Sequence, residues 1–399
     1  MEESPGSEKF PKSFDYDPFI FLRCHSRNKD PADVQTQVWQ CGFEPNRYDS
    51  SKTTSVVATC GGNSVCFIDC QSGRVLHKYY TKNVKDLLFA LAWTTLEENH
   101  INILAVAGSL STVHLLNWAK NECILEQSFG SRRKKAIHSL LFHPKYKSVL
   151  FCGSSDGTIT VCKLRYDNNG KYKLDVSSSI CGNSGEVFDL AYCKTTDSLL
   201  ASTNDGLVAF SYLTPNEKPS PCLGHPIKLL LPENPNSTLR DGSKLVDSVN
   251  VIGNGIIACK CALHGVIYIC DISVINNHEI NSDRAIKLIP RNILTWKNTD
   301  NYFMYMGSNP GSNILVCGDD AGCIWIWGLS DLESVVSKNV DPVCLLVWPQ
   351  LSDKYGDQKR KLSLQIYDIV IDKVAVSSSG DTIVSVTNNN LVCIWKRKL

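Results

Sequence analysis

The chain has 399 residues, of which 43% are hydrophobic and 20% are charged, and its formal net charge at pH 7 is +1. This composition supplies enough apolar side chains for a core and excludes wholesale disorder. The near-zero charge excludes a protein whose main activity is to coat nucleic acid. Residues 1–18 begin with the polar run MEESPGSEKF, which has no signal-peptide core, so we expect a flexible tail there. No apolar run approaches the roughly 18 residues of a membrane span, so we expect a soluble, intracellular protein without membrane contact.

Short strands follow one another from residue 19 onward, and helical periodicity is nearly absent. The first strand is FIFLRC (19–24), which has no repeat unit of its own. Groups of three apolar runs, separated by turn signals, then recur at 89–118, 137–164, 187–212, 246–272 and 303–329. Within 137–164, the pair Asp156-Gly157 predicts a tight hairpin between the second and third strands.

The third strand of each group carries a residue at one equivalent position. These residues are Ile68, Leu116, Cys162, Phe210, Cys270, Trp327 and Trp395, separated by 46 to 68 residues. A period slightly above 40 residues with four strands per unit is typical of WD40 propeller blades. The seven positions therefore predict an all-β, seven-bladed WD40 β-propeller over residues 19–399. Two packed all-β sandwiches are the alternative fold, which the seven-fold spacing disfavours.

The ends of the chain predict how the ring closes. The final strand LVCIWKRKL (391–399) ends without a fourth partner, and FIFLRC precedes the first blade. Pairing these two strands would cover a sheet edge that otherwise invites aggregation. We therefore expect an N-terminal strand to complete the C-terminal blade.

Signals of catalysis and metal binding are poor in the sequence. It contains no GxxxxGK[ST] or HExxH pattern and no CxxC pair. Of the 18 cysteines, Cys60, Cys66 and Cys70 lack zinc-type spacing with a histidine, and many others lie in apolar runs where a free cysteine acts as a small hydrophobe. We predict reduced, structural thiols, no metal site, no cofactor and no enzymatic activity, in a cytosolic or nuclear protein.

A basic run, Arg132, Arg133, Lys134 and Lys135, enters the third blade. It contains no interleaved aromatic residue, so one interpretation is a solvated loop. The other is an electrostatic contact with phosphate or an acidic partner, which would supply affinity without sequence readout. Nucleic acid is thus at most a secondary partner.

Aromatic residues stand near the entrances of three inner strands. They are Phe43 in VWQCGFEP, Phe89 in LLFALAW, and the adjacent pair Tyr302 and Phe303 in NYFMYM. The first strand of a propeller blade lines the central channel, so rings at its mouth can converge. Aromatic faces hold quaternary ammonium and methyl-lysine groups at roughly 0.5 to 2 kcal/mol per ring. The alternative is that these rings only fill the core.

Two resemblances to known families accompany these patterns. LLFALAWTTLEENHINILAVAGSLSTVHLLNW, followed by IHSLLFHP, resembles EED, the propeller subunit of the Polycomb repressive complex that methylates histone H3. FLRCHSRNKDPADVQTQVWQCGFEP, VVATCGGNSVCFIDCQSGRVLHKYY and ILVCGDDAGCIWIW resemble more closely the WD domain of the leucine-rich-repeat and WD-repeat protein associated with the origin recognition complex. The second resemblance covers nearly all of residues 19–399.

The resemblance implies a nuclear, chromatin-associated reader. In EED, an aromatic cage at the propeller mouth holds a trimethyl-lysine of a repressive histone mark. Matched by motif, the cage residues here would be Phe43, Phe89, Tyr302 and Phe303. The implied partners are a trimethylated histone tail and subunits of the origin recognition complex or other chromatin proteins. A scaffold that assembles protein complexes without binding methyl-lysine is the alternative function.

Overall fold

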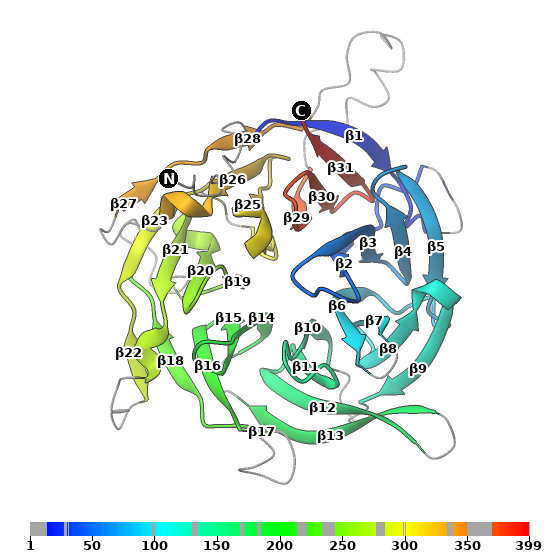
Figure 1. The fold of residues 1–399 in the computed structure, drawn as a ribbon, viewed down its shortest axis with the longest axis horizontal. Helices are drawn as coiled ribbons and strands as arrows, with labels where there is room; N and C mark the ends of the chain where they lie inside the picture. The colour runs from blue at the N-terminus through cyan, green and yellow to red at the C-terminus, as the bar shows by residue number, and fades with distance from the viewer. Residues whose placement is uncertain are drawn as a thin grey trace, which may run out of the picture.

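A computed structural model gives the structure of the protein. It describes residues 14–398 apart from 28–29, 31, 98–99, 130–134, 168–170, 182–184, 214–221, 234–243, 277–283, 298, 300, 333–337 and 349–368. The described strands form seven sheets arranged as a ring around a central axis (Figure 1). This arrangement confirms the predicted seven-bladed β-propeller.

The first three blades each contain four consecutive antiparallel strands, ordered from the centre outward. Their strands are β2 (Val38–Pro45), β3 (Thr53–Gly61), β4 (Ser64–Asp69), β5 (Arg74–Tyr80), β6 (Leu88–Leu96), β7 (Ile101–Gly108), β8 (Thr112–Asn117), β9 (Glu122–Ser128), β10 (Ile137–Phe142), β11 (Val149–Ser154), β12 (Thr158–Tyr166) and β13 (Tyr172–Cys181). At the predicted hairpin between β11 and β12, Gly157 has φ +77°, and the Asp156 carboxylate accepts the Thr158 N–H at 3.2 Å.

The fourth and fifth blades carry additional outer strands, and β18–β22 and β23–β27 pair in parallel. Their strands are β14 (Val187–Cys193), β15 (Ser198–Thr203), β16 (Gly206–Leu213), β17 (Cys222–Leu223), β18 (Ile227–Leu230), β22 (Ala285–Lys287), β19 (Ser248–Val251), β20 (Ile256–Cys261), β21 (Val266–Asp271), β23 (Pro290–Thr295) and β27 (Lys338–Val340). The sixth blade comprises β24 (Gly307–Asn309), β25 (Ile314–Gly318), β26 (Ile324–Gly328) and β28 (Cys344–Leu346). Short 3-10 turns lie at η2 (Trp118–Lys120), η3 (Ala262–His264), η4 (Ser273–Asn276), η5 (Pro310–Ser312) and η6 (Leu329–Leu332).

The seventh blade joins the two ends of the chain. It comprises β29 (Ile371–Val376), β30 (Thr382–Thr387) and β31 (Val392–Arg397), and β1 (Tyr16–Leu22) pairs antiparallel with β31 as its outermost strand (Figure 1). This confirms the expected ring closure. The strand begins at Tyr16, three residues before the boundary expected for the propeller, and Tyr16 pairs with Arg397. The tail expected over residues 1–18 falls, as far as residue 13, outside the described residues.

The core lies between blades rather than at one centre. Seven clusters of buried apolar side chains each span two neighbouring blades, and together they cover every interface of the ring. Middle strands are consequently buried on both faces, which explains their continuous apolar runs such as ILAVAG in β7. The seven predicted third-strand positions are each 2% exposed or less.

Two further expectations concern cysteines and membranes. All 18 cysteines are free thiols, and most of them are buried. Within the described ranges, no helix has the length and apolar character needed to cross a membrane.

Candidate functional site

The innermost strands of five blades carry a bulge one residue after they begin. In β2, for example, Val38 pairs with Gly61 and Gln40 pairs with Cys60, so Trp39 has no partner in the ladder. A bulge bends its strand and re-aims the extra side chain. The residues left over in this way are Trp39, Phe89, His138, Phe188 and Asp372. The same kind of bulge therefore occurs at the start of the innermost strand in five blades.

Three of these side chains form a closed set of contacts with Phe303. The ring centroids of Trp39 and Phe89 lie 5.3 Å apart, and those of Phe89 and His138 lie 5.5 Å apart. Phe303 completes the set at 6.0 Å from both His138 and Trp39. All four interplanar angles lie between 80° and 90°, the edge-to-face geometry that places a positive ring edge against a negative ring face. We call these four residues the ring cluster.

The adjacent pair Tyr302 and Phe303 contributes to the same place. Their centroids lie 4.8 Å apart, and Phe188 lies 6.0 Å from Tyr302 and 5.1 Å from Phe303. A strand was expected from residue 303, but β24 begins only at Gly307, and Tyr305 forms an isolated bridge with Lys373. Phe303 has φ +68°, which is uncommon for a bulky residue and typical of constrained sites. Because this stretch is not a strand, consecutive rings can lie on one side of the chain.

Phe43 lies elsewhere. It stands four residues after Trp39 in β2 and packs, partly buried, against the apolar cluster that contains Cys41 and Ala375. Among the described residues, it takes part in none of the ring contacts at the channel mouth. The structure therefore brings together three of the four predicted rings and places Trp39 where Phe43 was expected.

A sequence signal for the missed residues does exist. An apolar residue followed by an aromatic one opens four of the five bulged strands, at Val38-Trp39, Leu88-Phe89, Ile137-His138 and Val187-Phe188. The apolar member keeps its place in the ladder while the next residue is the one left unpaired. Comparing the first two residues of every inner strand would have identified Trp39, His138 and Phe188.

A polar cavity of about 230 Å³ lies along the inner strands and is shared with the ring cluster through His138. Its polar lining includes Gln40, Ser139, Asp189, Asn250 and Lys373. Asp189 accepts hydrogen bonds from the Ser248 hydroxyl at 3.0 Å and the Val249 N–H at 3.2 Å, and burial raises its pKa. The Lys373 ammonium donates to the Met306 carbonyl oxygen at 2.6 Å.

Two more buried carboxyl groups lie close to the channel. Asp247 and Lys260 form a fully buried ion pair at 2.5 Å, and burial raises the pKa of Asp247. Asp372 accepts a hydrogen bond from the Gln37 amide at 2.9 Å, and burial raises its pKa well above the ordinary value. Together with Asp189, these groups place three buried carboxyl groups near the rings, in the company of Lys260 and Lys373.

The imidazole of His138 is the one titratable member of the ring cluster. Burial lowers its pKa to about 4, so the ring is neutral at neutral pH. Its Nδ1 atom lies 2.8 Å from a carboxylate oxygen of Glu186, and burial raises the pKa of Glu186. A carboxyl group therefore stands directly beside the ring cluster.

Of the basic run Arg132–Lys135, the structure describes only Lys135. Arg132, Arg133 and Lys134 lie outside the described residues. Lys135 forms an ion pair with Asp156 of the next hairpin, and its backbone N–H donates to the Ser111 hydroxyl at 2.9 Å. The charge of Lys135 is thus already paired within the fold.

Comparisons with known proteins agree with this architecture. Residues 11–398 match the family described as the WD domain of leucine-rich repeat and WD repeat-containing protein 1. Proteins of that name from Mus musculus, Xenopus laevis and Homo sapiens are 30%, 29% and 27% identical over 99%, 98% and 100% of this chain. The chain spans 60%, 54% and 60% of their respective lengths.

One solved structure shares the fold. A chain of a humanized mutant of the Chaetomium thermophilum Polycomb Repressive Complex 2 superimposes with a TM-score of 0.68 over 97% of this chain and 98% of its own. Its sequence identity is 13%, so the likeness concerns the propeller fold alone.

Proposed function

This chain belongs to the family of the WD domain of leucine-rich repeat and WD repeat-containing protein 1, and from this premise we propose that it is a non-enzymatic chromatin reader. In this proposal the ring cluster and Tyr302 bind a trimethylated lysine of a repressive histone tail. The chain then links that mark to the origin recognition complex or to other chromatin proteins in the nucleus. The resemblance to EED implied a cage of this kind, and we now assign its walls to Trp39, Phe89, Tyr302 and Phe303.

The observation that carries the proposal is the convergence of rings from distant parts of the chain. Trp39 is nearly perpendicular to both Phe89 and Phe303, at 82° and 87°, so the three rings do not stack into one layer. Differently oriented ring faces can surround one cation, and tryptophan is the strongest cation–π partner. Tyr302 is 44% exposed, which leaves its ring accessible to a ligand.

Carboxyl groups near the rings are a second feature that supports a positive ligand. Glu186 lies beside His138, and burial together with the nearby Asp189, Asp247 and Asp372 raises the pKa of Tyr305. A cation that approaches the rings therefore meets carboxyl groups in addition to π-faces. Since an unmethylated lysine carries the same charge but is more strongly hydrated, selectivity for the methylated form would rest on the rings.

The rings contact one another, so a trimethylammonium group can enter only if they separate. Trp39 and Phe89 belong to inner strands that are held by ladder hydrogen bonds. Tyr302 and Phe303 precede β24 and lie outside any regular strand. We expect the Tyr302–Phe303 wall to move when the ligand binds.

The experiment is a calorimetric titration of the purified chain with repressive histone tail peptides that carry trimethylated or unmodified lysine. We expect tighter binding of the trimethylated peptide and a loss of about 1 to 2 kcal/mol in Phe89→Ala or Tyr302→Ala. Tyr166→Ala is the matched control, because Tyr166 is 58% exposed and lies in β12. Equal affinity for both peptides would refute methyl-lysine reading.

A specific observation favours the alternative function of an assembly scaffold. The strands β1 and β28 are neighbours on the outer edge of the ring (Figure 1). They carry exposed large apolar side chains, including Phe19, Phe21 and Leu345. The Phe21 ring of β1 lies 5.3 Å from the ring of Trp348, two residues after the end of β28. Exposed apolar patches of this kind often mark protein interfaces. If origin-complex subunits bind equally well after Phe89→Ala but not after Phe21→Asp, the rim is the assembly surface.

A further inference from the structure

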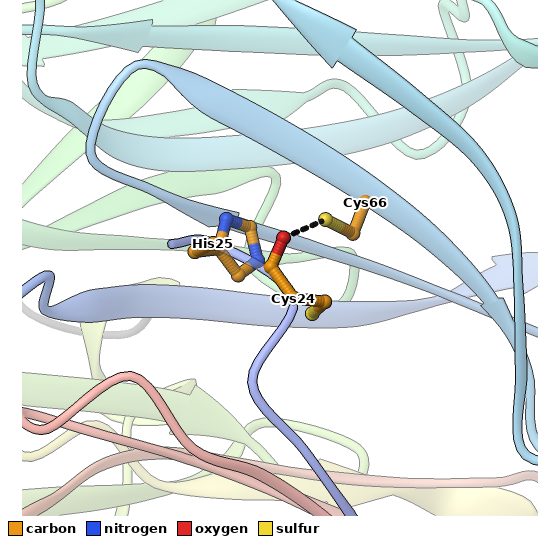
Figure 2. A group of neighbouring side chains, drawn as sticks. All are labelled: Cys24, His25 and Cys66. Carbon is orange, nitrogen blue, oxygen red and sulfur yellow. Dashed lines mark hydrogen bonds between the residues drawn. The ribbon is translucent and has the colours of Figure 1, made fainter. Parts of the chain in front are cut away.

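Ring closure brings two cysteines together that lie far apart in the sequence. Cys24 follows the closing strand β1, and Cys66 lies in β4 of the first blade. Figure 2 shows the Cys66 thiol donating a hydrogen bond to the Cys24 carbonyl oxygen at 3.2 Å, with His25 beside them. One donor atom from each of Cys24, His25 and Cys66 lies within 4.8 Å of the other two. The two sulfur atoms are thus near neighbours.

The two thiols differ in accessibility and acidity. Cys66 is fully buried, whereas Cys24 is partly exposed. A hydrogen bond from Cys66, with further contributions from His25 and Lys78, lowers the pKa of the Cys24 thiol well below its ordinary value, although burial opposes this. Burial raises the pKa of Cys66. A partly exposed thiolate beside a protonated second thiol is the arrangement of redox-sensing cysteine pairs.

A metal ion is the competing occupant, since thiolates and imidazole are ligands for Zn²⁺. Both ring nitrogens of His25 already have partners, Nδ1 with the Ser64 hydroxyl at 2.9 Å and Nε2 with the Thr59 hydroxyl at 2.8 Å. A metal would have to displace one of them. Lys78 also adds positive charge near Cys24, which disfavours a divalent cation.

We propose that Cys24 and Cys66 form a reversible oxidation site, in which a peroxide converts the pair to a disulfide. The Cys24 thiolate attacks hydrogen peroxide, which breaks the O–O bond and gives a Cys24 sulfenic acid and hydroxide. The Cys66 thiol then attacks the Cys24 sulfur, the S–S bond forms, and the sulfenic oxygen leaves as water with the Cys66 proton. Peroxide is the electron acceptor throughout, and a dithiol reductant reverses the change.

The disulfide would fasten the closing strand to the first blade. β1 is bonded to β31 of the seventh blade, and the new covalent bond would join the segment after β1 to β4. The ring would then be closed by a covalent bond in addition to hydrogen bonds. We expect slower hydrogen exchange of β1 amides in the oxidised protein.

The test treats the purified, fully reduced chain with a small excess of hydrogen peroxide and analyses it by intact mass and non-reducing peptide mapping. We expect the loss of two hydrogen atoms, a cross-linked peptide that contains Cys24 and Cys66, and full reversal by dithiothreitol. In Cys66→Ser, which keeps a hydrogen-bond donor beside Cys24, the reaction should stop at a Cys24 sulfenic acid, which dimedone traps. Cys24→Ser should abolish both products.

Cys181 provides the control, because it is the exposed thiol and its strand lies in the third blade. If exposure alone governed reactivity, limiting iodoacetamide would alkylate Cys181 before Cys24. We expect Cys24 to react several-fold faster, and Cys181→Ser to leave the cross-link unchanged. Faster alkylation of Cys181, failure to form the cross-link, or stoichiometric Zn²⁺ that is lost in Cys66→Ala would each overturn the proposal.

Discussion

Replacing Trp39 by alanine should weaken binding of a trimethyl-lysine peptide, whereas replacing Phe43 should not. The two residues stand four positions apart in β2, but only Trp39 contacts Phe89 and Phe303. Phe43 instead packs against the apolar cluster shared by the first and seventh blades. The pair of variants therefore separates ligand binding from packing within one strand.

The two substitutions should change different free energies, that of peptide binding for Trp39→Ala and that of unfolding alone for Phe43→Ala. A cation held against tryptophan is worth up to roughly 2 kcal/mol, so Trp39→Ala should raise the peptide dissociation constant by about 5- to 30-fold. Trp39→Ala also loses two edge-to-face contacts, each worth about 0.5 to 1.5 kcal/mol of folding free energy. Phe43 is only partly buried, so Phe43→Ala should lower the free energy of unfolding by about 1 to 3 kcal/mol and leave peptide affinity unchanged.

Calorimetry measures the affinity of each variant, and urea unfolding measures its stability. Trp39→Phe should retain part of the affinity, because it keeps an aromatic face at the site. The reasoning would be refuted if Phe43→Ala weakened binding as strongly as Trp39→Ala at a concentration where both are folded. It would also fail if Trp39→Ala bound the peptide normally.

Three further predictions concern the fold. Lys260→Ala leaves Asp247 buried without its partner and should lower the free energy of unfolding, measured in urea, by about 3 to 5 kcal/mol. Adding Asp247→Asn should restore part of this free energy, and no recovery would contradict the pairing. At Gly108 a Cβ atom would lie 1.8 Å from a backbone carbonyl oxygen, so Gly108→Ala should cost about 1 to 3 kcal/mol. Gly253→Ala, whose nearest contact would be 3.7 Å away, should change thermal stability by less than about 0.5 kcal/mol, and equal losses would refute the steric argument. Burial lowers the pKa of His143 to about 4, so the unfolded chain takes up the proton first. The contribution of His143 to the free energy of unfolding should therefore be constant above about pH 6.5 and fall by up to about 3 kcal/mol as the pH drops to 4, and His143→Gln should flatten this part of the pH profile in urea titrations.

The blade count could be predicted because one position per blade repeats. Residues such as Ile68, Trp327 and Trp395 fill the interface between blades, and their burial keeps them apolar. The closing strand could be predicted for a similar reason, since an unpaired last strand needs a partner. These features depend on patterns that persist over the whole chain.

The assignment of Phe43 to the cage rested on a motif match, which does not locate a bulge. In β2 the ladder shifts at Trp39, and it is Trp39 that contacts Phe89 and Phe303. Tyr302 and Phe303 do lie together, as expected. They can do so because Phe303 has a left-handed backbone conformation before β24 begins, which the sequence does not reveal. The neighbourhood of Cys24 and Cys66 was missed, because only ring closure brings them close.

The pairing of β1 with β31 also bears on how the molecule is made. Tyr16 leaves the ribosome long before its partner Arg397, which follows it by 381 residues. Six blades can assemble during translation, yet the seventh cannot be finished until β31 has been made. During that interval the nascent chain carries an unsatisfied edge at each end, a period in which chaperones would have most to protect.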